Sequence, residues 1–258
     1  MTERVRNRPE PEPERTVEEE RLHRKRCLAA GFRLFAKFGF NEGVAGHITA
    51  RDPGEPGLFW VNPFARHFGR IKVSDLVLVD AKGTVVEGNA RVNRAAVTIH
   101  GAVHDARPEV VGCAHSHSVH GKAWAALGRP LLPITQDDCV FFEDHALYDE
   151  FGGAAFDFEE GKRIATALGP NKAAILRNHG LITVGLTVEE CVAWFVKMER
   201  SCQVHLLAHG ATAAGPPIPI DDETARMTRE DIGRPASGRN GFRPLWEMIV
   251  AEQPDLLD

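Results

Sequence analysis

Apolar positions along the chain recur with two periods, which predicts a mixture of helices and strands. A capping-box pair, Thr16 and Glu19, precedes apolar residues at helical spacing, and Gly39 ends this first predicted helix. The same reasoning predicts further helices over 93–107, 121–127, 158–168 and 188–210, and two weaker helical segments near 221–227 and 244–250.

Short runs of apolar or alternating residues, bounded by glycine, proline and asparagine, predict strands between these helices. The runs cover residues 46–52, 58–63, 75–80, 84–88, 109–117, 172–178 and 181–185. Several neighbouring runs are joined by short turns and therefore form hairpins, so the sheet is not purely parallel. The pattern predicts one α/β domain, layered around a mixed sheet.

The two ends of the chain differ from this central region. Residues 1–15 are rich in proline, glutamate and arginine, and we expect a flexible arm there because such a segment buries too little apolar surface to become ordered. The folded domain is expected to cover residues 16–215. Residues 216–258 are expected to form a helical tail.

Composition narrows the class of protein. A formal net charge of −5 argues against a nucleic-acid partner. No apolar run approaches the roughly 18–20 residues needed to cross a bilayer, so no membrane partner is expected. The first residues lack the apolar stretch of a signal peptide, and five scattered cysteines show no C-x-x-C pair. These features favour reduced thiols and a cytoplasmic protein.

Histidines supply the candidate chemistry. On a strand, His115 and His117 point to the same face, where imidazole nitrogens can converge on one metal ion. His179 lies far downstream at a predicted bend beside Gly180, and such a bend can reach the end of an adjacent strand. Spacing alone leaves a metal site and ordinary packed or surface histidines equally open.

A second pair, His100 and His104, shares one face of a predicted helix because the two residues are four positions apart. Zinc can bind such a pair, but the glutamate of the H-E-x-x-H motif is absent from this run. We therefore expect His100 and His104 to pack or to make hydrogen bonds behind the site.

Six segments together resemble the class II aldolase/adducin family over roughly residues 17–210. They read AGHITARD, VNPFARHF, SDLVLVD, IHGAVHDARPEVVGCAHSHSVHG, PITQDDC and LRNHGLITVG. The resemblance implies a three-layer α/β/α fold around a mixed, largely antiparallel sheet, and a homotetramer with active sites at subunit contacts. It also implies that His115, His117 and His179 bind one divalent metal ion per chain. Zinc or iron(II) is expected, with manganese or cobalt as alternatives.

The departures from the family's pattern bear on the substrate. Where its sugar-phosphate aldolases carry an acidic residue, this chain has Ala96. The serine pair of the family's phosphate site falls on Arg94 and Ala95, and its asparagine falls on His47. A small non-phosphorylated substrate is therefore expected. Arg94, His47 and His67 suit a carboxylate better, although each is also compatible with a structural hydrogen bond.

One acidic residue matches a catalytic position of the family. Asp138 corresponds to the acid–base aspartate of its pentulose-phosphate epimerases, and Asp137 is the neighbouring alternative. An aspartate there is suited to proton transfer. A loop aspartate that makes turn hydrogen bonds is an equal alternative.

Three hypotheses for the function follow. The first is a metal-dependent lyase that performs aldol cleavage or decarboxylation on an oxo or hydroxy acid, with an aromatic body as one option, because three neutral histidines leave the ion a strong Lewis acid with open positions. The second is a mononuclear non-haem iron(II) oxygenase that acts on an aromatic 2-oxo or 2-hydroxy acid. The third is a non-enzymatic interaction module of the adducin type, which the retained histidines disfavour.

Overall fold

An eight-stranded sheet lies at the centre of the computed structural model, which describes residues 13–153, 157–211, 213 and 215–258. The strands follow the order β4-β3-β2-β1-β5-β8-β7-β6, and neighbours are antiparallel except for the parallel pair β6 and β7. The strands are β1 (His47–Arg51), β2 (Leu58–Val61), β3 (Val77–Asp80), β4 (Val85–Glu87), β5 (Gly112–Ser116), β6 (His145–Tyr148), β7 (Ala173–Leu176) and β8 (Gly180–Gly185).

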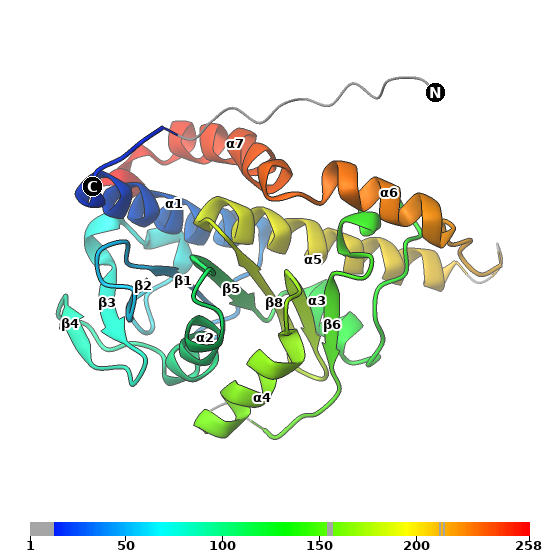
Figure 1. The fold of residues 1–258 in the computed structure, drawn as a ribbon, viewed down its shortest axis with the longest axis horizontal. Coiled ribbons are helices and arrows are strands. Elements are labelled where there is room, and N and C mark those ends of the chain that lie inside the picture. Colours follow the sequence, from blue (N-terminus) through cyan, green and yellow to red (C-terminus); the bar gives the residue numbers. More distant parts are fainter. Residues whose placement is uncertain (1–12, 154–156, 212, 214) are drawn as a thin grey trace.

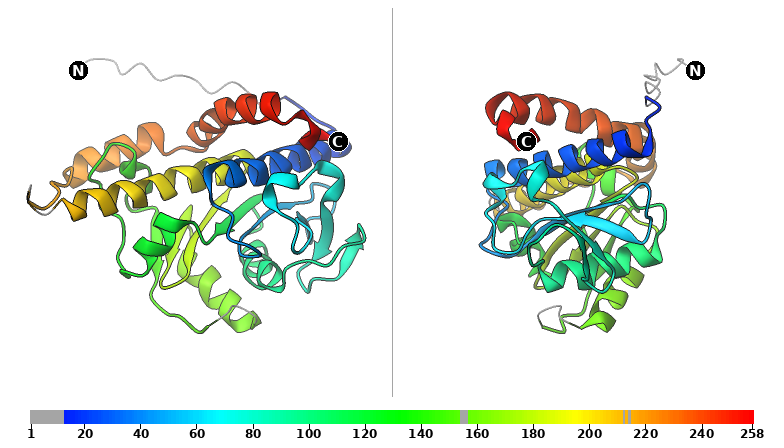
Figure 2. Two further views of the ribbon diagram at one scale, coloured as in Figure 1. Left: turned by 180° about the vertical axis from the view of Figure 1, so that it is seen from behind. Right: turned by 90° about the vertical axis from the view of Figure 1, so that its left-hand side faces the viewer.

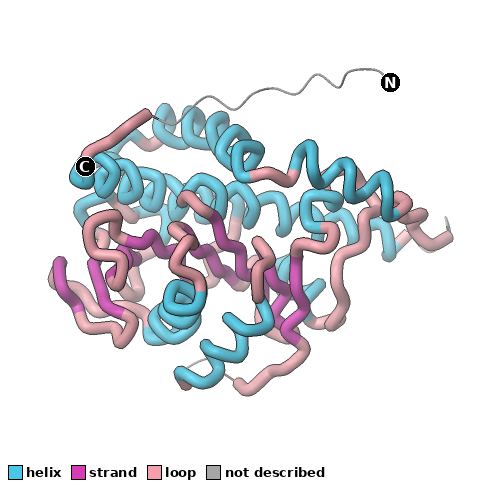
Figure 3. The backbone as a smooth tube through the Cα atoms, in the orientation of Figure 1, coloured by secondary structure: helices cyan, strands magenta, loops and turns pink. Residues whose placement is uncertain are grey.

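Helices cover both faces of this sheet, which gives three layers (Figure 1, Figure 3). On one face lie α2 (Arg94–Ala106) and α4 (Phe158–Leu168). On the other lie α1 (Val17–Phe38), α3 (Val119–Ala125) and α5 (Val188–Gly210). The C-terminal helix α7 (Pro235–Glu252) packs outside α1 and α5, and α6 (Asp222–Ile232) precedes it (Figure 2).

The alternation of side chains along the strands divides the interior in two. Ile48 and Ala50 of β1 join the larger apolar cluster beneath α1 and α5. Cys113 of β5 joins a second cluster with Ile99 of α2 and Ile164 of α4. The polar residues of β1 and β5 that face α2 are therefore the ones that can build a site on that side.

The predicted α/β fold with a mixed, largely antiparallel sheet is confirmed. The predicted capping box is also present, because Thr16 accepts from the Glu19 amide while the Glu19 side chain accepts from the Thr16 amide. Gly39 ends α1 with a φ of 75°, in the left-handed region that favours glycine.

Sequence analysis missed one strand, β6, which follows a proline-rich loop and pairs only with β7. Both weak C-terminal segments are helical, as α6 and α7. Most of the predicted flexible arm, residues 1–12, lies outside the described residues. Within the described ranges, no helix is both long and apolar enough to cross a membrane.

Candidate metal centre

Three imidazoles meet at one end of the central strands. His115 lies on β5, His117 follows the end of that strand, and His179 lies in the turn between β7 and β8. Ring centroids are 5.1 Å apart for His115 and His117, 4.7 Å for His115 and His179, and 4.8 Å for His117 and His179. One nitrogen of each ring lies within 4.8 Å of the other two. The pairing of β5 with β8 thus joins two segments that are far apart in the sequence.

The backbone at the turn explains this convergence. Asn178 has a φ of 59°, a left-handed conformation that asparagine tolerates better than most residues. A Cβ at Gly180 would lie 2.7 Å from the carbonyl oxygen of Ser116, so only glycine lets β8 approach β5 this closely. The Asn178–Gly180 turn therefore positions His179 against the end of β5.

His115 is oriented for metal binding by a backbone carbonyl. Its Nδ1–H donates to the Leu181 oxygen at 2.8 Å, since a carbonyl can only accept. The Nε2 lone pair is therefore available to the other histidines, as is usual for metal-binding imidazoles. Burial lowers the pKa of His115 well below its ordinary value, and the neighbouring imidazoles His179, His47 and His117 add to the effect. The ring is neutral and able to bind a metal.

The other two rings are neutral for similar reasons. Burial lowers the pKa of His117, and the Lys122 ammonium lowers it further. Burial, with a smaller contribution from His117, lowers the pKa of His179 to about 4. Three converging, neutral imidazoles fit a divalent metal ion, which histidine binds in its unprotonated form.

A buried carboxylate holds the segment that follows His117. Glu199 on α5 accepts from the Gly121 amide at 2.7 Å and from the His120 amide at 3.0 Å, and Ser118 donates its hydroxyl to the same side chain. These contacts satisfy the free amides at the start of α3. They fix the chain directly after His117.

The histidines open into a pocket of about 870 Å³. Arg91, Arg94 and Lys122 line it, together with the exposed phenylalanines Phe64 and Phe151. No carboxylate is among the described residues that line it. Lys122 is paired with Glu42 at 3.6 Å, whereas Arg91 and Arg94 make no ion pair with a described residue. The two free guanidiniums and the apolar walls suit an anionic substrate that has an apolar body.

Two predicted substrate-binding residues, His47 and Arg94, line this pocket. His47 lies directly opposite His115 in the pairing of β1 with β5. His67 is not among the lining residues. It precedes a 3₁₀ turn, where its Nδ1 accepts from the Gly69 amide at 3.0 Å and its Nε2 contacts Asn41 at 2.8 Å. A substrate role for His67 stays a prediction.

Asp138 lies in a different cavity, between α5, α7 and the loop that begins near Thr135. Its Oδ2 accepts from the amide and the hydroxyl of Thr135, at 2.8 and 2.7 Å, and its buried Oδ1 has no hydrogen-bond partner among the described residues. Burial opposes ionisation, but the neighbouring polar groups of His205, Ser201 and Thr135 hold the pKa of Asp138 below its ordinary value. Within one chain, Asp138 does not reach the histidine pocket.

Ala96 has a fully buried methyl group that packs with Phe59 and Val61. The start of α2 therefore presents Arg94 and Ala95 to the pocket, and neither can bind a metal ion.

Sequence reasoning missed several residues of the pocket, including Arg91, Lys122 and Phe151. Lys122 lies five residues after His117, in the first turn of a predicted helix, and this closeness to a candidate ligand could have indicated that it lines the pocket. Arg91 and Phe151 lie in loops with no distinctive pattern.

A second group of possible ligands, His23, Cys27 and Glu189, lies between α1 and α5. Two of its possible ligand atoms are already hydrogen-bonded to each other, because His23 Nε2 and Glu189 Oε1 are 2.7 Å apart. Burial also raises the pKa of the Cys27 thiol well above its ordinary value, so the thiolate that a metal requires is disfavoured. The histidine pocket is the stronger candidate.

The layered fold and the histidine site together are those of a class II aldolase-type enzyme. Residues 26–206 match the Class II Aldolase and Adducin N-terminal domain. The chain belongs to this family.

Three relatives illustrate the similarity. Decarboxylase NovR from Streptomyces niveus is 43% identical over 243 residues, which is 93% of this chain and 89% of that protein. A 4-hydroxy-3-prenylphenylpyruvate oxygenase/4-hydroxy-3-prenylbenzoate synthase from Streptomyces roseochromogenus subsp. oscitans is also 43% identical, over 93% of this chain and 87% of its own. The solved structure of an L-fuculose 1-phosphate aldolase from Glaciozyma antarctica PI12 is 44% identical, with a TM-score of 0.88 and 96% of both chains covered.

Proposed function

We propose that this protein is a metal-dependent lyase that decarboxylates a non-phosphorylated oxo or hydroxy acid with an aromatic body. One observation carries the proposal: within one chain, the pocket combines three converging neutral histidines with three cationic side chains, and Glu42, which is paired with Lys122 at 3.6 Å, is not one of its lining residues. Aldol cleavage and epimerisation require a base near the reacting carbon or hydroxyl. Loss of carbon dioxide from a carboxylate beta to a metal-polarised carbonyl requires no base for its first step, because the electron pair of the breaking bond passes to the carbonyl oxygen.

The metal would be held by His115, His117 and His179. When bound, a divalent ion supplies a Lewis acid that polarises an oxygen of the substrate. The hydrogen bond from His115 to Leu181 supports this assignment, because it leaves the Nε2 lone pair free.

The protein's own side chains would select and orient the acid. Arg94 lies at the start of α2 and makes no ion pair with a described residue, so its guanidinium is available for a carboxylate. Arg91 lies over the Phe64 ring, 5.6 Å from its centroid. Phe64 and Phe151 provide apolar surface for an aromatic body.

A sugar phosphate is a poorer fit, although one similar structure is named as an L-fuculose 1-phosphate aldolase. In this chain Arg94 and Ala95 occupy the place of the serine pair, and Ala96 occupies the place of the acid. Ala96 packs in the core and can neither bind a metal nor accept a proton.

The second candidate is an iron(II) oxygenase that acts on an aromatic 2-oxo or 2-hydroxy acid. It is favoured by the relative named as an oxygenase, which is as similar to this chain as the decarboxylase is. A site with few protein ligands leaves positions for both substrate and dioxygen.

The decisive experiment measures metal content and turnover on protein purified anaerobically without a chelating tag. The expected result is about one metal ion per chain and carbon dioxide release, without oxygen, from a 3-oxo acid with an aromatic body such as benzoylacetate. Iron together with oxygen uptake that depends on phenylpyruvate or 4-hydroxymandelate would establish the oxygenase instead. Cleavage of L-fuculose 1-phosphate at a higher kcat/KM than any of these acids would refute both candidates. A protein without metal or turnover would be an interaction module.

A further inference from the structure

A continuous line of polar side chains runs from Arg51 to His47 between β1 and α2. His47, Thr49 and Arg51 alternate along β1, so they share the face that α2 covers. His100 and His104 lie one turn apart on α2 and face these residues. In each of the three histidines and Thr49, no more than 4% of the residue surface is exposed.

Each neighbouring pair in this line is within hydrogen-bond distance. His47 Nδ1 lies 3.0 Å from His100 Nε2, and His100 Nδ1 lies 2.9 Å from the Thr49 hydroxyl. The same hydroxyl lies 2.9 Å from His104 Nε2. His104 Nδ1 lies 3.3 Å from Arg51 Nη2.

The cation at one end sets the direction of every bond. Arg51 Nη2 donates to the carbonyls of His104 and Arg107 at 2.6 and 3.1 Å, and it shares a hydrogen with His104 Nδ1 at 3.3 Å. A guanidinium only donates, so Nδ1 turns its lone pair toward the cation, and the proton of the neutral His104 ring lies on Nε2. Thr49 then accepts from His104 and donates its single proton to His100 Nδ1. His100 in turn donates from Nε2 to His47 Nδ1, which leaves the proton of His47 on Nε2.

The rings are neutral, as this scheme requires. Each ring accepts a hydrogen bond at one nitrogen, and a protonated imidazole has no lone pair with which to accept. Burial together with the Arg51 cation also lowers the pKa of His104 to about 3. Each ring therefore offers one N–H and one lone pair.

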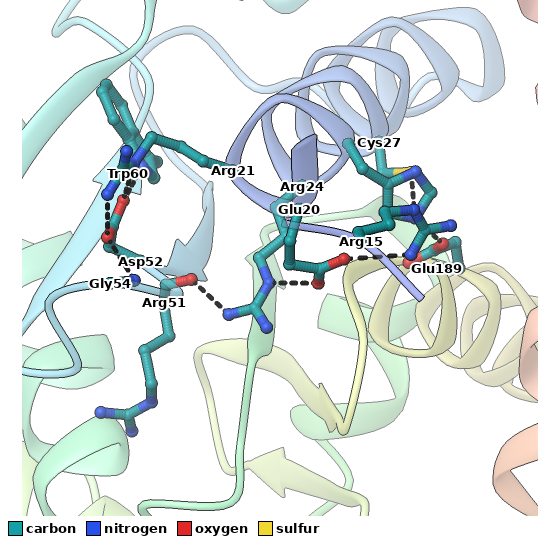
Figure 4. A network of polar contacts seen from close by, with 11 residues as sticks. Arg15, Glu20, Arg21, Arg24, Cys27, Arg51, Asp52, Gly54, Trp60 and Glu189 are labelled. Atoms are coloured by element: carbon teal, nitrogen blue, oxygen red, sulfur yellow. Dashed lines mark hydrogen bonds and ion pairs between the residues drawn. The ribbon is translucent and has the colours of Figure 1, made fainter. Parts of the chain in front are cut away.

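Arg51 is itself firmly held. Its Nη2 donates to the His104 carbonyl at 2.6 Å, and its Nε donates to the Val110 carbonyl at 2.9 Å. Its own carbonyl accepts from Arg24 of α1 at 2.8 Å (Figure 4). In the same network, Asp52 accepts two hydrogen bonds from Arg21 (Figure 4).

We propose that Arg51, His104, Thr49 and His100 are positioning residues that fix His47 in its Nε2–H form, so that His47 presents a hydrogen-bond donor to a substrate oxygen beside His115. The substrate part rests on the proposed function, whereas the tautomer does not. An Nε2–H nitrogen has no lone pair in the ring plane, so His47 in this form is neither a fourth metal ligand nor a base.

The tautomer is read directly by two-bond ¹H–¹⁵N correlation spectra of ¹⁵N-histidine-labelled, zinc-loaded protein, with the His47 signals assigned by their loss in His47→Gln. The expected wild-type pattern is Nε2–H. Thr49→Val breaks the line and should give a mixture of tautomers, while Thr49→Ser retains the hydroxyl and the single form.

Thr98→Val is the matched control, because Thr98 is also buried but its hydroxyl has no hydrogen-bond partner among the described residues. An Nδ1–H wild type, or a Thr49→Val spectrum like that of wild type, would refute the proposal.

The role of the donor is tested by the dissociation constant of phenylpyruvate, measured on zinc-loaded protein without turnover. His47→Phe removes the donor and should weaken binding roughly tenfold to a hundredfold, because the lost bond is to a charged oxygen. His47→Gln keeps an N–H near the same place and should stay within about threefold of wild type. Zinc content should be unchanged in both variants, and loss of zinc in His47→Phe would identify His47 as a ligand and overturn the inference. If no acid is turned over, the proposed function fails. The inference about His47 is still decided, because the tautomer and the zinc content do not depend on turnover.

Discussion

At the scale of single residues, the candidate site depends on which protonation state each imidazole adopts. His115 donates from Nδ1 to a carbonyl and keeps its Nε2 lone pair, whereas the hydrogen bonds of His47 imply the opposite arrangement. Two histidines that face each other across β1 and β5 therefore differ in chemistry. In both rings Nδ1 points away from the pocket, and its hydrogen-bond partner sets the tautomer. That partner is the Leu181 carbonyl for His115 and the His100 ring for His47.

The first prediction concerns His179. Replacing His179 with alanine removes one of the three converging nitrogens, and we expect metal affinity to fall by at least about a hundredfold. Metal content after dialysis and competition with a chromogenic chelator measure this effect. His209→Ala, which alters an exposed histidine near the end of α5, is the matched control. Full metal content in His179→Ala would show that the ion is bound elsewhere.

At the scale of elements, the site depends on how α3 is attached to α5. Helix α3 is short and begins directly after His117, and its first amides donate to Glu199 instead of water. Only 1% of the Glu199 side-chain surface is exposed. One buried carboxylate thus links the segment after the candidate ligand His117 to α5, the longest of the described helices.

The second prediction follows from this attachment. Glu199→Gln replaces a charged acceptor of several hydrogen bonds with a neutral one, and we expect a loss of about 1–3 kcal/mol in the free energy of unfolding. Metal affinity should fall roughly tenfold, because His117 is less well fixed. Urea unfolding and chelator competition report the two effects, with the exposed Glu247→Gln of α7 as control. Unchanged values for both would mean that α3 does not depend on this carboxylate.

At the scale of the whole molecule, the histidine pocket and the Asp138 cavity are separate places in one chain. If the chains assemble as the predicted tetramer, with active sites at subunit contacts, Asp138 of one chain can serve the pocket of another. We keep its predicted proton-transfer role in this form.

Mixed assemblies test that role. We expect His179→Ala and Asp138→Asn each to reduce turnover of the acid by roughly a hundredfold or more. Mixing the two inactive proteins should restore part of the activity, because some sites then combine an intact metal centre with an intact aspartate. Asp137→Asn is the control, since Asp137 is exposed and paired with Lys197. If Asp138→Asn turns over the acid at the wild-type rate, Asp138 has no catalytic role.

The stability of the whole domain should depend on pH through its buried neutral histidines. The pKa of His104 is lowered to about 3 in the folded protein, while in the unfolded chain it is about 6.5. The unfolded chain therefore binds more protons as the pH falls below about 6.5, and the free energy of unfolding decreases. His104 should contribute a loss of about 2 kcal/mol between pH 6.5 and 5.

Urea unfolding of metal-free protein at several pH values measures this dependence. His104→Gln should reduce it, whereas the exposed His209→Gln should not. A stability that is constant from pH 7 to 5 would contradict the prediction.

The sequence by itself determined most of the elements and indicated the candidate ligands. Period and capping residues placed α1, α2, α5 and seven of the strands, because those signals are local to each segment. Spacing drew attention to His115, His117 and His179 but left a metal site and ordinary histidines equally open. The resemblance to the class II aldolase/adducin family supplied the ligand set.

Only the tertiary structure decided what surrounds those ligands. The packing of α2 on β1 brings His100 to His47 and Thr49, although 53 and 51 positions separate it from them along the chain. Strand β6 lies at the edge of the sheet and pairs, among the described strands, with β7 alone. Asp138 and His67 lie away from the pocket for the same reason: a side chain's neighbours depend on contacts between distant segments, which no local pattern encodes.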